Sequence, residues 1–246
     1  MIQTSSLPES WYDLPLAVFD LETTGFDFVT CEIIEVGIVQ FYRGEVQKVY
    51  NWLIDPECQI PENITELTHI TQADVTGQPK FREVAPLILA AFADRGIVAY
   101  NSSFDCPFLT YKLRNIGLDW PSSNPILDPL VFAQHLWPNQ KNKLGMVAER
   151  LGVSLVDAHR ACNDAEATGK VLYAMRDQLP TALKELLVCQ AEWSRAHSRF
   201  GRDNHLLVAQ CSSVNNLSTS FLDGDEPDPL RSIYASVPMM RREISR

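Results

Sequence analysis

Two acidic residues, Asp20 and Glu22, stand one residue apart inside the run VFDLETTGF, Val18–Phe26. Asp and Glu are poor strand formers, so their place in an apolar strand needs a reason. Residues two apart on a strand face the same side, which sets the two carboxylates side by side. Like charges at that separation repel unless a cation lies between them. The pair therefore indicates either a solvated strand face or a cation site.

Three further residues could complete such a site. Asp105 stands at a predicted helix start. His159 precedes a later predicted helix, and Asp164 lies in the first turn of that helix. Taken singly, each acid also fits a solvated surface residue or a helix-start residue, and His159 fits an ordinary loop histidine. Taken together, the acids lie in apolar surroundings, at the strand ends and helix starts where an α/β sheet gathers a site. Converging carboxylates repel strongly, so we expect them to bind a hard divalent cation, Mg²⁺ or Mn²⁺.

Four carboxylates suit a pair of metal ions about 3.5–4 Å apart, an arrangement that assists phosphoryl displacement. One ion acidifies the attacking water and the other stabilises the leaving oxygen. Histidine ordinarily titrates near pH 6.5, so it can take a proton from water at neutral pH. Five residues span roughly 140° of a continuous helix, so His159 and Asp164 would diverge on one. We therefore expect His159 on the loop before the helix, folded back toward the metals.

The elements that must position these residues follow an α/β order. Apolar runs predict three strands joined as an antiparallel meander, with a hairpin turn at Gly44. Helical spacing and short apolar runs then alternate, giving the order βββαβαβαα and a mixed sheet. The expected strands are Leu16–Leu21, Glu32–Tyr42, Val46–Ile54, Ile97–Tyr100 and Ile126–Leu127, and the main helices Lys80–Gly96, Cys106–Ile116, one ending near His135, Leu144–Leu151 and Asn163–Gln178.

Composition and charge argue against several classes of protein. The 246 residues are 46% apolar, and no apolar run approaches the roughly 18 residues of a membrane span. The N-terminal segment lacks the basic start and apolar core of a signal peptide, so a cytoplasmic protein with reduced cysteines is expected. The net charge of −10 falls within residues 1–180, which hold 13 Lys and Arg against 23 Asp and Glu. Such a chain is a poor non-specific nucleic-acid binder, so metal ions or local contacts would have to attract a nucleic acid.

Three ordered motifs carry a family resemblance: FDLETTG at Phe19–Gly25, NSSFD at Asn101–Asp105 and HRACND at His159–Asp164. In these the chain resembles the DnaQ-like, or DEDDh, 3′→5′ exonucleases, the family of the proofreading subunit of bacterial replicative DNA polymerases. The likeness covers about Leu14–Leu179. It implies a ribonuclease H-like fold, with a five-stranded mixed sheet flanked by helices.

The resemblance also implies roles for individual residues. Asp20, Glu22, Asp105 and Asp164 would ligate two Mg²⁺ or Mn²⁺ ions, and His159 would be the general base. The reaction would cut the last phosphodiester of a single strand from its 3′ end and release a nucleoside 5′-monophosphate, from DNA more than from RNA. The terminal nucleotide would be held by Thr23, Thr24, Phe26, Asn101 and Phe104.

Some of these assignments have alternatives. Phe26 would stack on a base, or else be a partly buried aromatic at a strand end. Phe104 would shape the same pocket, or else belong to the core. Two positions depart from the family pattern, since His69 stands where a glycine is common and Tyr100 where a histidine is common. Neither is assigned a catalytic role.

We expect residues 1–180 to form the exonuclease domain and residues 181–246 a C-terminal extension. The extension would contain an amphipathic helix, Leu183–Phe200, then a polar linker and a short apolar segment, Ile233–Met240. It could bind a polymerase or another replication or repair protein, for proofreading or repair. Alternatively the helix packs back on the domain. Two other functions stay open: RNA 3′-end trimming, and a binding or adaptor module with incidental catalysis.

Overall fold

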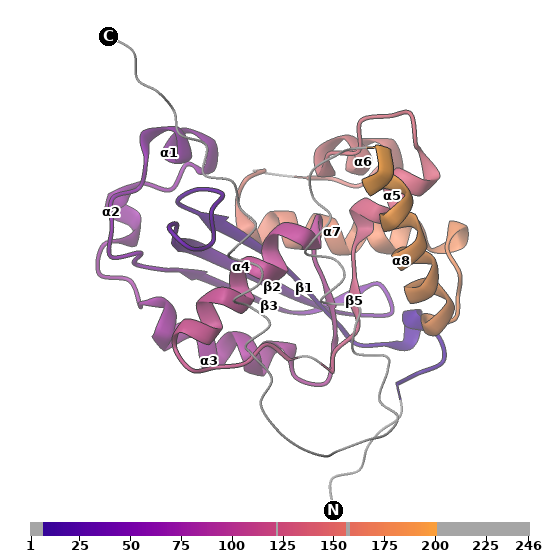
Figure 1. Cartoon of the computed structure of the whole chain (residues 1–246), viewed down its shortest axis with the longest axis horizontal. Helices are drawn as coiled ribbons and strands as arrows, with labels where there is room; N and C mark the ends of the chain where they lie inside the picture. Colours follow the sequence, from indigo (N-terminus) through magenta and orange to yellow (C-terminus); the bar gives the residue numbers. More distant parts are fainter. Residues whose placement is uncertain (1–6, 122, 156–157, 201–246) are drawn as a thin grey trace, which may run out of the picture. The chain divides into compact units, whose positions relative to one another are not determined.

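The computed structural model describes residues 7–121, 123–155 and 158–200. Its centre is a five-stranded sheet with the strand order β3-β2-β1-β4-β5 (Figure 1). The strands are β1 Leu16–Thr23, β2 Ile33–Tyr42, β3 Glu45–Leu53, β4 Gly96–Val98 and β5 Ile126–Leu127. The first three form an antiparallel meander, while β4 pairs parallel to β1 and β5 pairs parallel to β4. The predicted mixed α/β sheet is confirmed.

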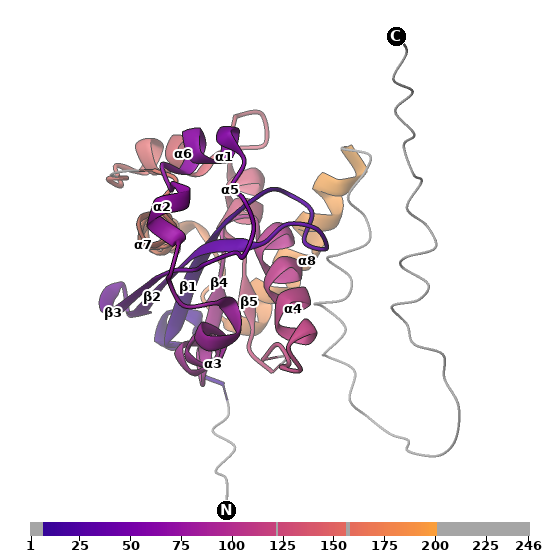
Figure 2. The ribbon, with the colours of Figure 1, turned by 90° about the vertical axis from the view of Figure 1, so that its left-hand side faces the viewer.

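Helices cover both faces of the sheet. The helices are α1 Glu62–Thr68, α2 Gln72–Val75, α3 Phe81–Phe92, α4 Ser102–Asn115, α5 Pro129–Leu136, α6 Leu144–Leu151, α7 Ala161–Ala174 and α8 Leu183–Phe200, with single 3₁₀ turns at Trp11–Asp13 and Arg176–Gln178. Figure 2 shows α4 and α7 on opposite sides of the sheet. No helix in the described part of the chain is long and apolar enough to cross a bilayer.

The alternation of side chains along β1 divides the core between these two faces. Leu16 and Val18 belong to the apolar cluster that includes α5, α6, α7 and α8. Phe19 and Leu21 belong to the cluster that includes α3 and α4. Asp20 continues the Leu16–Val18 stripe, because residues two apart on a strand face the same side. The acidic pair therefore points to the side that carries α7.

The helix α8 packs on the sheet and covers its β5 edge. Leu183 and Leu186 are buried in the core. The Gln190 side-chain amide accepts a hydrogen bond from the Asp128 N–H (2.8 Å) and donates one to the Ile126 carbonyl (3.0 Å). A sixth strand would form hydrogen bonds with these same two backbone groups. The Gln190 side chain therefore protects an edge of the sheet that would otherwise be open. The predicted helix is confirmed, and it packs back on the sheet.

Several element boundaries differ from the sequence-based expectation. The helix expected from Cys106 begins at Ser102, after Asn101 in a left-handed conformation (φ 70°). The helix expected over Asn163–Gln178 begins at Ala161 and ends at Ala174, and the 3₁₀ turn Arg176–Gln178 follows it. His69 ends α1 with φ 58°, a left-handed position that glycine occupies without strain. The polar linker and the Ile233–Met240 segment lie outside the described residues.

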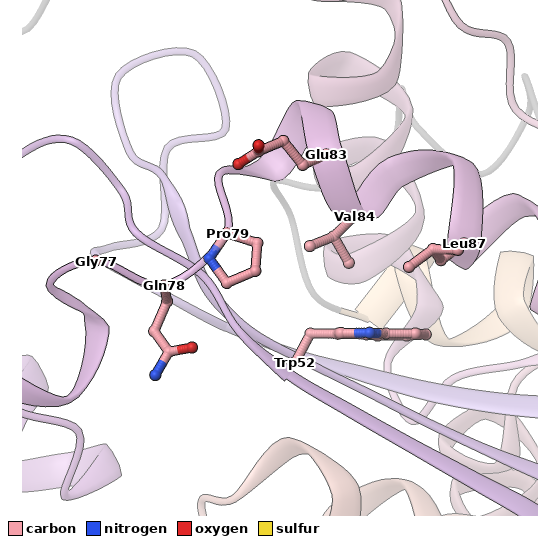
Figure 3. Close-up of a pocket in the computed structure, with 7 residues that line it drawn as sticks. All are labelled: Trp52, Gly77, Gln78, Pro79, Glu83, Val84 and Leu87. Atoms are coloured by element: carbon pink, nitrogen blue, oxygen red, sulfur yellow. The ribbon is translucent and has the colours of Figure 1, made fainter.

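A pocket of about 530 Å³ opens beside the edge strand β3. In Figure 3 the Trp52 ring lies under Val84 and Leu87 of α3, with Pro79 beside them. None of the residues predicted to act in catalysis lines this pocket.

Candidate active site

Close contact between β2 and α7 brings the third motif to the acidic pair. Gly37 of β2 pairs directly with Asp20 of β1. A Cβ atom on Gly37 would lie only 2.3 Å from the Ala161 carbonyl carbon and from the Cys162 nitrogen. The first turn of α7 therefore rests on β2 where the strand has no side chain, next to the strand that carries Asp20 and Glu22.

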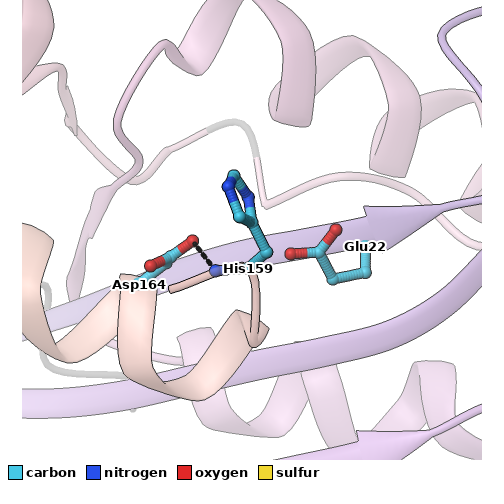
Figure 4. Close-up of side chains that lie close together, drawn as sticks. All are labelled: Glu22, His159 and Asp164. Atoms are coloured by element: carbon cyan, nitrogen blue, oxygen red, sulfur yellow. Dashed lines mark hydrogen bonds between the residues drawn. The ribbon is translucent and has the colours of Figure 1, made fainter. Parts of the chain in front are cut away.

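Three of the predicted residues meet at this point. Ligand atoms of Glu22, His159 and Asp164 all lie within 4.8 Å of one another. His159 precedes α7 in a left-handed conformation (φ 66°), and its backbone N–H donates a hydrogen bond to Asp164 Oδ2 (3.1 Å). Figure 4 shows the His159 side chain between the two carboxylates. The expectation that His159 lies on the loop before the helix and Asp164 within the helix is confirmed.

Asp20 and Asp105 lie close enough to this group to interact with it electrostatically, although they are outside the 4.8 Å cluster. Burial raises the pKa of Asp20 well above its ordinary value, and the carboxyls of Asp105, Glu22 and Asp164 raise it further. Burial likewise raises the pKa of Asp105, followed by the effect of Asp128. Asp105 is 4% exposed in the first turn of α4. Four acidic side chains thus face one small volume.

The remaining two carboxyls show the same pattern. Burial, then the nearby carboxyls of Asp164 and Glu35, raise the pKa of Glu22 to about 8. Burial also raises the pKa of Asp164, while its hydrogen bond from the His159 backbone lowers it. Charged carboxylates are disfavoured here because they are desolvated and mutually repulsive. A cation among them would remove both penalties.

The donor set fits a hard divalent cation. Asp164 Oδ1 is buried and has no hydrogen-bond partner among the described residues, so this carboxylate keeps one oxygen with full acceptor capacity. Carboxylate oxygens are the ligands that Mg²⁺ and Mn²⁺ prefer in proteins. Cys162, beside Asp164 in sequence, is not a member of the Glu22–His159–Asp164 group.

A buried ion pair fixes the start of α7, and the sequence analysis did not find it. Glu35 is completely buried and accepts hydrogen bonds from Arg160 Nη2 (2.7 Å), the Ala161 N–H (3.0 Å) and Asn51 Nδ2 (3.0 Å). Arg160 follows His159 directly, so the pair holds the histidine loop on β2. The available signal was an acid inside the apolar run EIIEVGIV, the same anomaly that marked Asp20. Arg160 also acts on the carboxylates of the site, since it lowers the pKa of Glu22.

A second buried acid, Asp128, orders the start of α4. Its Oδ1 accepts hydrogen bonds from the Asn101 N–H (3.0 Å) and the Leu130 N–H (2.9 Å). Its Oδ2 accepts hydrogen bonds from the N–H (2.8 Å) and hydroxyl (2.9 Å) of Ser102. This network holds Asn101 in its left-handed conformation and thereby sets the turn that carries Asp105. From the sequence, Asp128 was expected only to lie between the strand Ile126–Leu127 and the helix that ends near His135.

The residues predicted to hold a nucleotide lie around the end of β1. Phe26 is 81% exposed, so the alternative of a partly buried aromatic was wrong, and its ring lies 6.2 Å from that of Phe104. Thr23 and Thr24 are buried and order the loop after β1. The Thr23 hydroxyl donates to the Gly25 carbonyl (2.7 Å), and the Thr24 hydroxyl accepts from the Glu32 N–H (2.9 Å).

The chain can be compared with known proteins on this basis. A family model described as "Exonuclease", RNase_T, matches residues 17–172. This chain belongs to that exonuclease family. The resemblance to DnaQ-like DEDDh enzymes is confirmed, and with it a hydrolase that acts on phosphodiester bonds.

The exonuclease domain is similar to part of several replicative polymerases. It is 41% identical over 165 residues to the PolC-type DNA polymerase III of Clostridium perfringens and 36% identical over 172 residues to that of Thermotoga maritima. These matches cover 67% and 70% of this chain. The chain spans only 11–12% of the length of these polymerases.

Solved exonucleases share the fold. Exonuclease X in complex with duplex DNA that has a 5′ overhang aligns with a TM-score of 0.58 at 21% identity, covering 71% of this chain and 99% of that one. Escherichia coli exonuclease I in complex with a dT13 oligonucleotide aligns with a TM-score of 0.60 at 16% identity, covering 66% of this chain and 41% of that one. At these identities the likeness supports the ribonuclease H-like fold alone.

Proposed function

We infer that this exonuclease removes nucleotides one at a time from the 3′ end of a single nucleic-acid strand. The products would be nucleoside 5′-monophosphates, and the preferred substrate DNA, in proofreading or repair. The observation that carries the inference is the convergence of Glu22, His159 and Asp164 beside the buried carboxyls of Asp20 and Asp105. The three motifs thus meet at one point of the fold.

In this proposal Asp20, Glu22, Asp105 and Asp164 hold two Mg²⁺ or Mn²⁺ ions. The unpartnered Asp164 Oδ1 and the raised pKa values of these carboxyls support a cation at this position. When bound, the ions would supply Lewis-acid activation of water and of the scissile phosphate. His159 would accept the proton of the attacking water at its imidazole, because the ring is exposed beside the carboxylates.

The exposed Phe26 and the partly buried Phe104 would hold the terminal base. Phe26 offers an open ring face, and Phe104 supports it from α4. Stacking tolerates any base, which suits an exonuclease that degrades strands of any sequence. The Thr24 hydroxyl accepts its hydrogen bond within the loop, so its own proton is free to be donated to the terminal sugar. Asn101 is exposed at the start of α4 and would line the same space.

Labelled single strands test the proposal directly. The purified chain would be incubated with DNA and RNA of equal sequence, labelled at the 5′ or the 3′ end, with Mg²⁺, Mn²⁺ or EDTA. We expect 5′-labelled DNA to shorten stepwise, with mononucleotide released at once from the 3′ label, and no reaction in EDTA. Faster loss of RNA would assign the enzyme to RNA trimming. Degradation from the 5′ end, or cleavage in EDTA, would refute the proposal.

A further inference from the structure

A groove of about 1060 Å³ adjoins the start of α4. Its walls come from Tyr100 and Asn101, from α5 and α8, and from the loop that joins α5 to α6. Figure 1 shows α5 next to α8. Asn101 lines the groove and also begins the helix whose first turn carries Phe104 and Asp105. The groove therefore reaches the candidate active site at this residue.

The loop of the groove is held in one shape by its own residues. The Tyr100 hydroxyl donates a hydrogen bond to the Asn142 carbonyl (2.6 Å), and Asn142 Nδ2 donates one to the Trp137 carbonyl (3.0 Å). Arg150 donates to Asn142 Oδ1 (3.0 Å) and to the Lys141 carbonyl (3.2 Å), and its guanidinium lies 4.6 Å from the centre of the Trp137 ring. The neighbouring side chains are thus presented on a preorganised backbone.

The charge of this groove is opposite to that of the chain. Lys141 and Lys143 line it, and no acidic residue in the described part of the chain does. Neither lysine forms an ion pair with another described residue, whereas Lys80, Lys112 and Lys170 each have a carboxylate partner. In a chain of net charge −10, two lysines without such partners beside the active site mark a place for an anionic ligand.

The remaining polar lining suits a sugar–phosphate backbone. Amide side chains line the groove together with the two lysines: Asn101, Gln134, Asn139 and Gln140. Amides both donate and accept hydrogen bonds, so they can contact phosphate and sugar oxygens without reading the bases. Lysine supplies the charge that displaces phosphate counterions.

We propose that this groove binds the backbone of the nucleotides that precede the scissile bond, with Lys141 and Lys143 on two successive phosphates. This assignment rests on the proposed 3′→5′ activity. It explains how an acidic domain retains a polyanion: two lysines without a described carboxylate partner lie along the path of the strand. It also implies that the activity depends on strand length, since a dinucleotide reaches only the active site.

The test compares the double variant Lys141→Ala/Lys143→Ala with the matched control Lys48→Ala/Lys184→Ala. Lys48 and Lys184 are exposed and form no ion pair with another described residue, and neither lines the groove. For each protein, kcat/KM would be measured with Mg²⁺ on a single-stranded 12-mer and on a dinucleotide. We expect the ratio of the two values to fall about 10-fold in the groove variant and to stay within about 2-fold in the control. An unchanged ratio, or an equal loss on both substrates, would overturn the groove assignment.

The salt dependence of cleavage and a separate binding measurement give two further readouts. Loss of two phosphate contacts to a single strand should make the slope of log kcat/KM against log salt shallower by about 1.4. Fluorescence anisotropy with a labelled dT12 strand in EDTA measures binding alone. Weaker binding by the groove variant supports the groove even if the wild-type chain cleaves nothing, in which case only the proposed activity fails. Equal binding by all three proteins overturns the groove even if cleavage is normal.

Discussion

Individual carboxyls at this site oppose folding stability when no cation is bound. Asp20, Glu22, Asp105 and Asp164 all have raised pKa values because they are buried near one another. The burial and mutual repulsion of these carboxyls favour binding of a cation. The same two features lower the stability of the fold when no cation is bound. Activity and metal-free stability should respond to substitution in opposite directions.

Asp20→Asn tests this opposition. We expect kcat to fall by at least about 100-fold, the scale seen when one preorganised electrostatic contact is lost. The same change should raise Tm in EDTA, because it removes a buried carboxyl that four others repel. Activity assays and thermal melts of the same sample provide both numbers. Wild-type activity in this variant would contradict the assignment of Asp20 to the metal site.

The Glu22 carboxyl should make the stability of the metal-free fold decrease as the pH rises. Its pKa is raised from 4.5 to about 8 in the fold, so the folded chain holds a proton that the unfolded chain releases. Its contribution to stability is complete below pH 4.5 and is lost as the pH rises to about 8. In EDTA, Tm should fall between pH 5 and pH 8, and saturating Mn²⁺ should raise Tm more at pH 8 than at pH 5. Glu22→Gln should reduce both trends, and a wild-type pH profile in that variant would refute the assignment.

At the scale of elements, the position of α7 depends on a missing side chain and on a buried ion pair. Gly37 lets the first turn of α7 rest on β2, and Glu35 binds Arg160 and the Ala161 N–H there. His159 and Asp164 flank these contacts in sequence. Both features therefore set the position of these two residues.

Gly37→Ala should displace this turn, since the added Cβ would lie 2.3 Å from backbone atoms. We expect at least about a 10-fold loss of kcat, because small misplacements of catalytic groups are costly. Gly145→Ala is the matched control, because a Cβ there meets only Leu155 at 3.7 Å and alanine favours the helix by about 0.5–1 kcal/mol. A Gly37→Ala variant as active as the control would contradict the role of this contact.

Arg160→Ala should leave the buried Glu35 without its charged partner. A buried charged group that loses its partner costs about 1–3 kcal/mol of the free energy of unfolding, or more. Urea denaturation measures this loss. Arg160→Lys should restore charge but not the two-nitrogen contact, so we expect partial recovery of stability and of kcat. Equal defects in the two variants would show that the charge itself contributes nothing.

At the scale of the molecule, α8 is joined to the sheet that carries the site. Leu183 and Leu186 fill the core, and Gln190 pairs with the β5 edge beside Asp128. Asp128 in turn orders Asn101 and Ser102. We therefore propose that the exonuclease domain extends through α8, so that the extension available to a partner begins after it.

Truncation after Pro180 should lower stability by several kcal/mol, because two leucines leave the core at about 1.5–3 kcal/mol each. A chain that ends at Phe200 keeps α8 and is the control. Gln190→Ala should have a smaller effect, about 1–2 kcal/mol, by exposing two unpaired backbone groups. Thermal melts rank the variants. A chain truncated at Pro180 that is as stable as the control would show that α8 is dispensable.

The sequence by itself determined the fold class and identified the residues whose side chains could carry out chemistry. Asp20 and Glu22 are recognisable because local alternation sets them on one strand face, and the helix start at Asp164 is a local signal too. The ion pair of Glu35 with Arg160 and the pairing of Gln190 with β5 join segments more than 60 residues apart. Only the tertiary structure decided these, because long-range pairing depends on which segments pack together. The same reason applies to Gly37, where a strand glycine gains its meaning from the helix that lies against it.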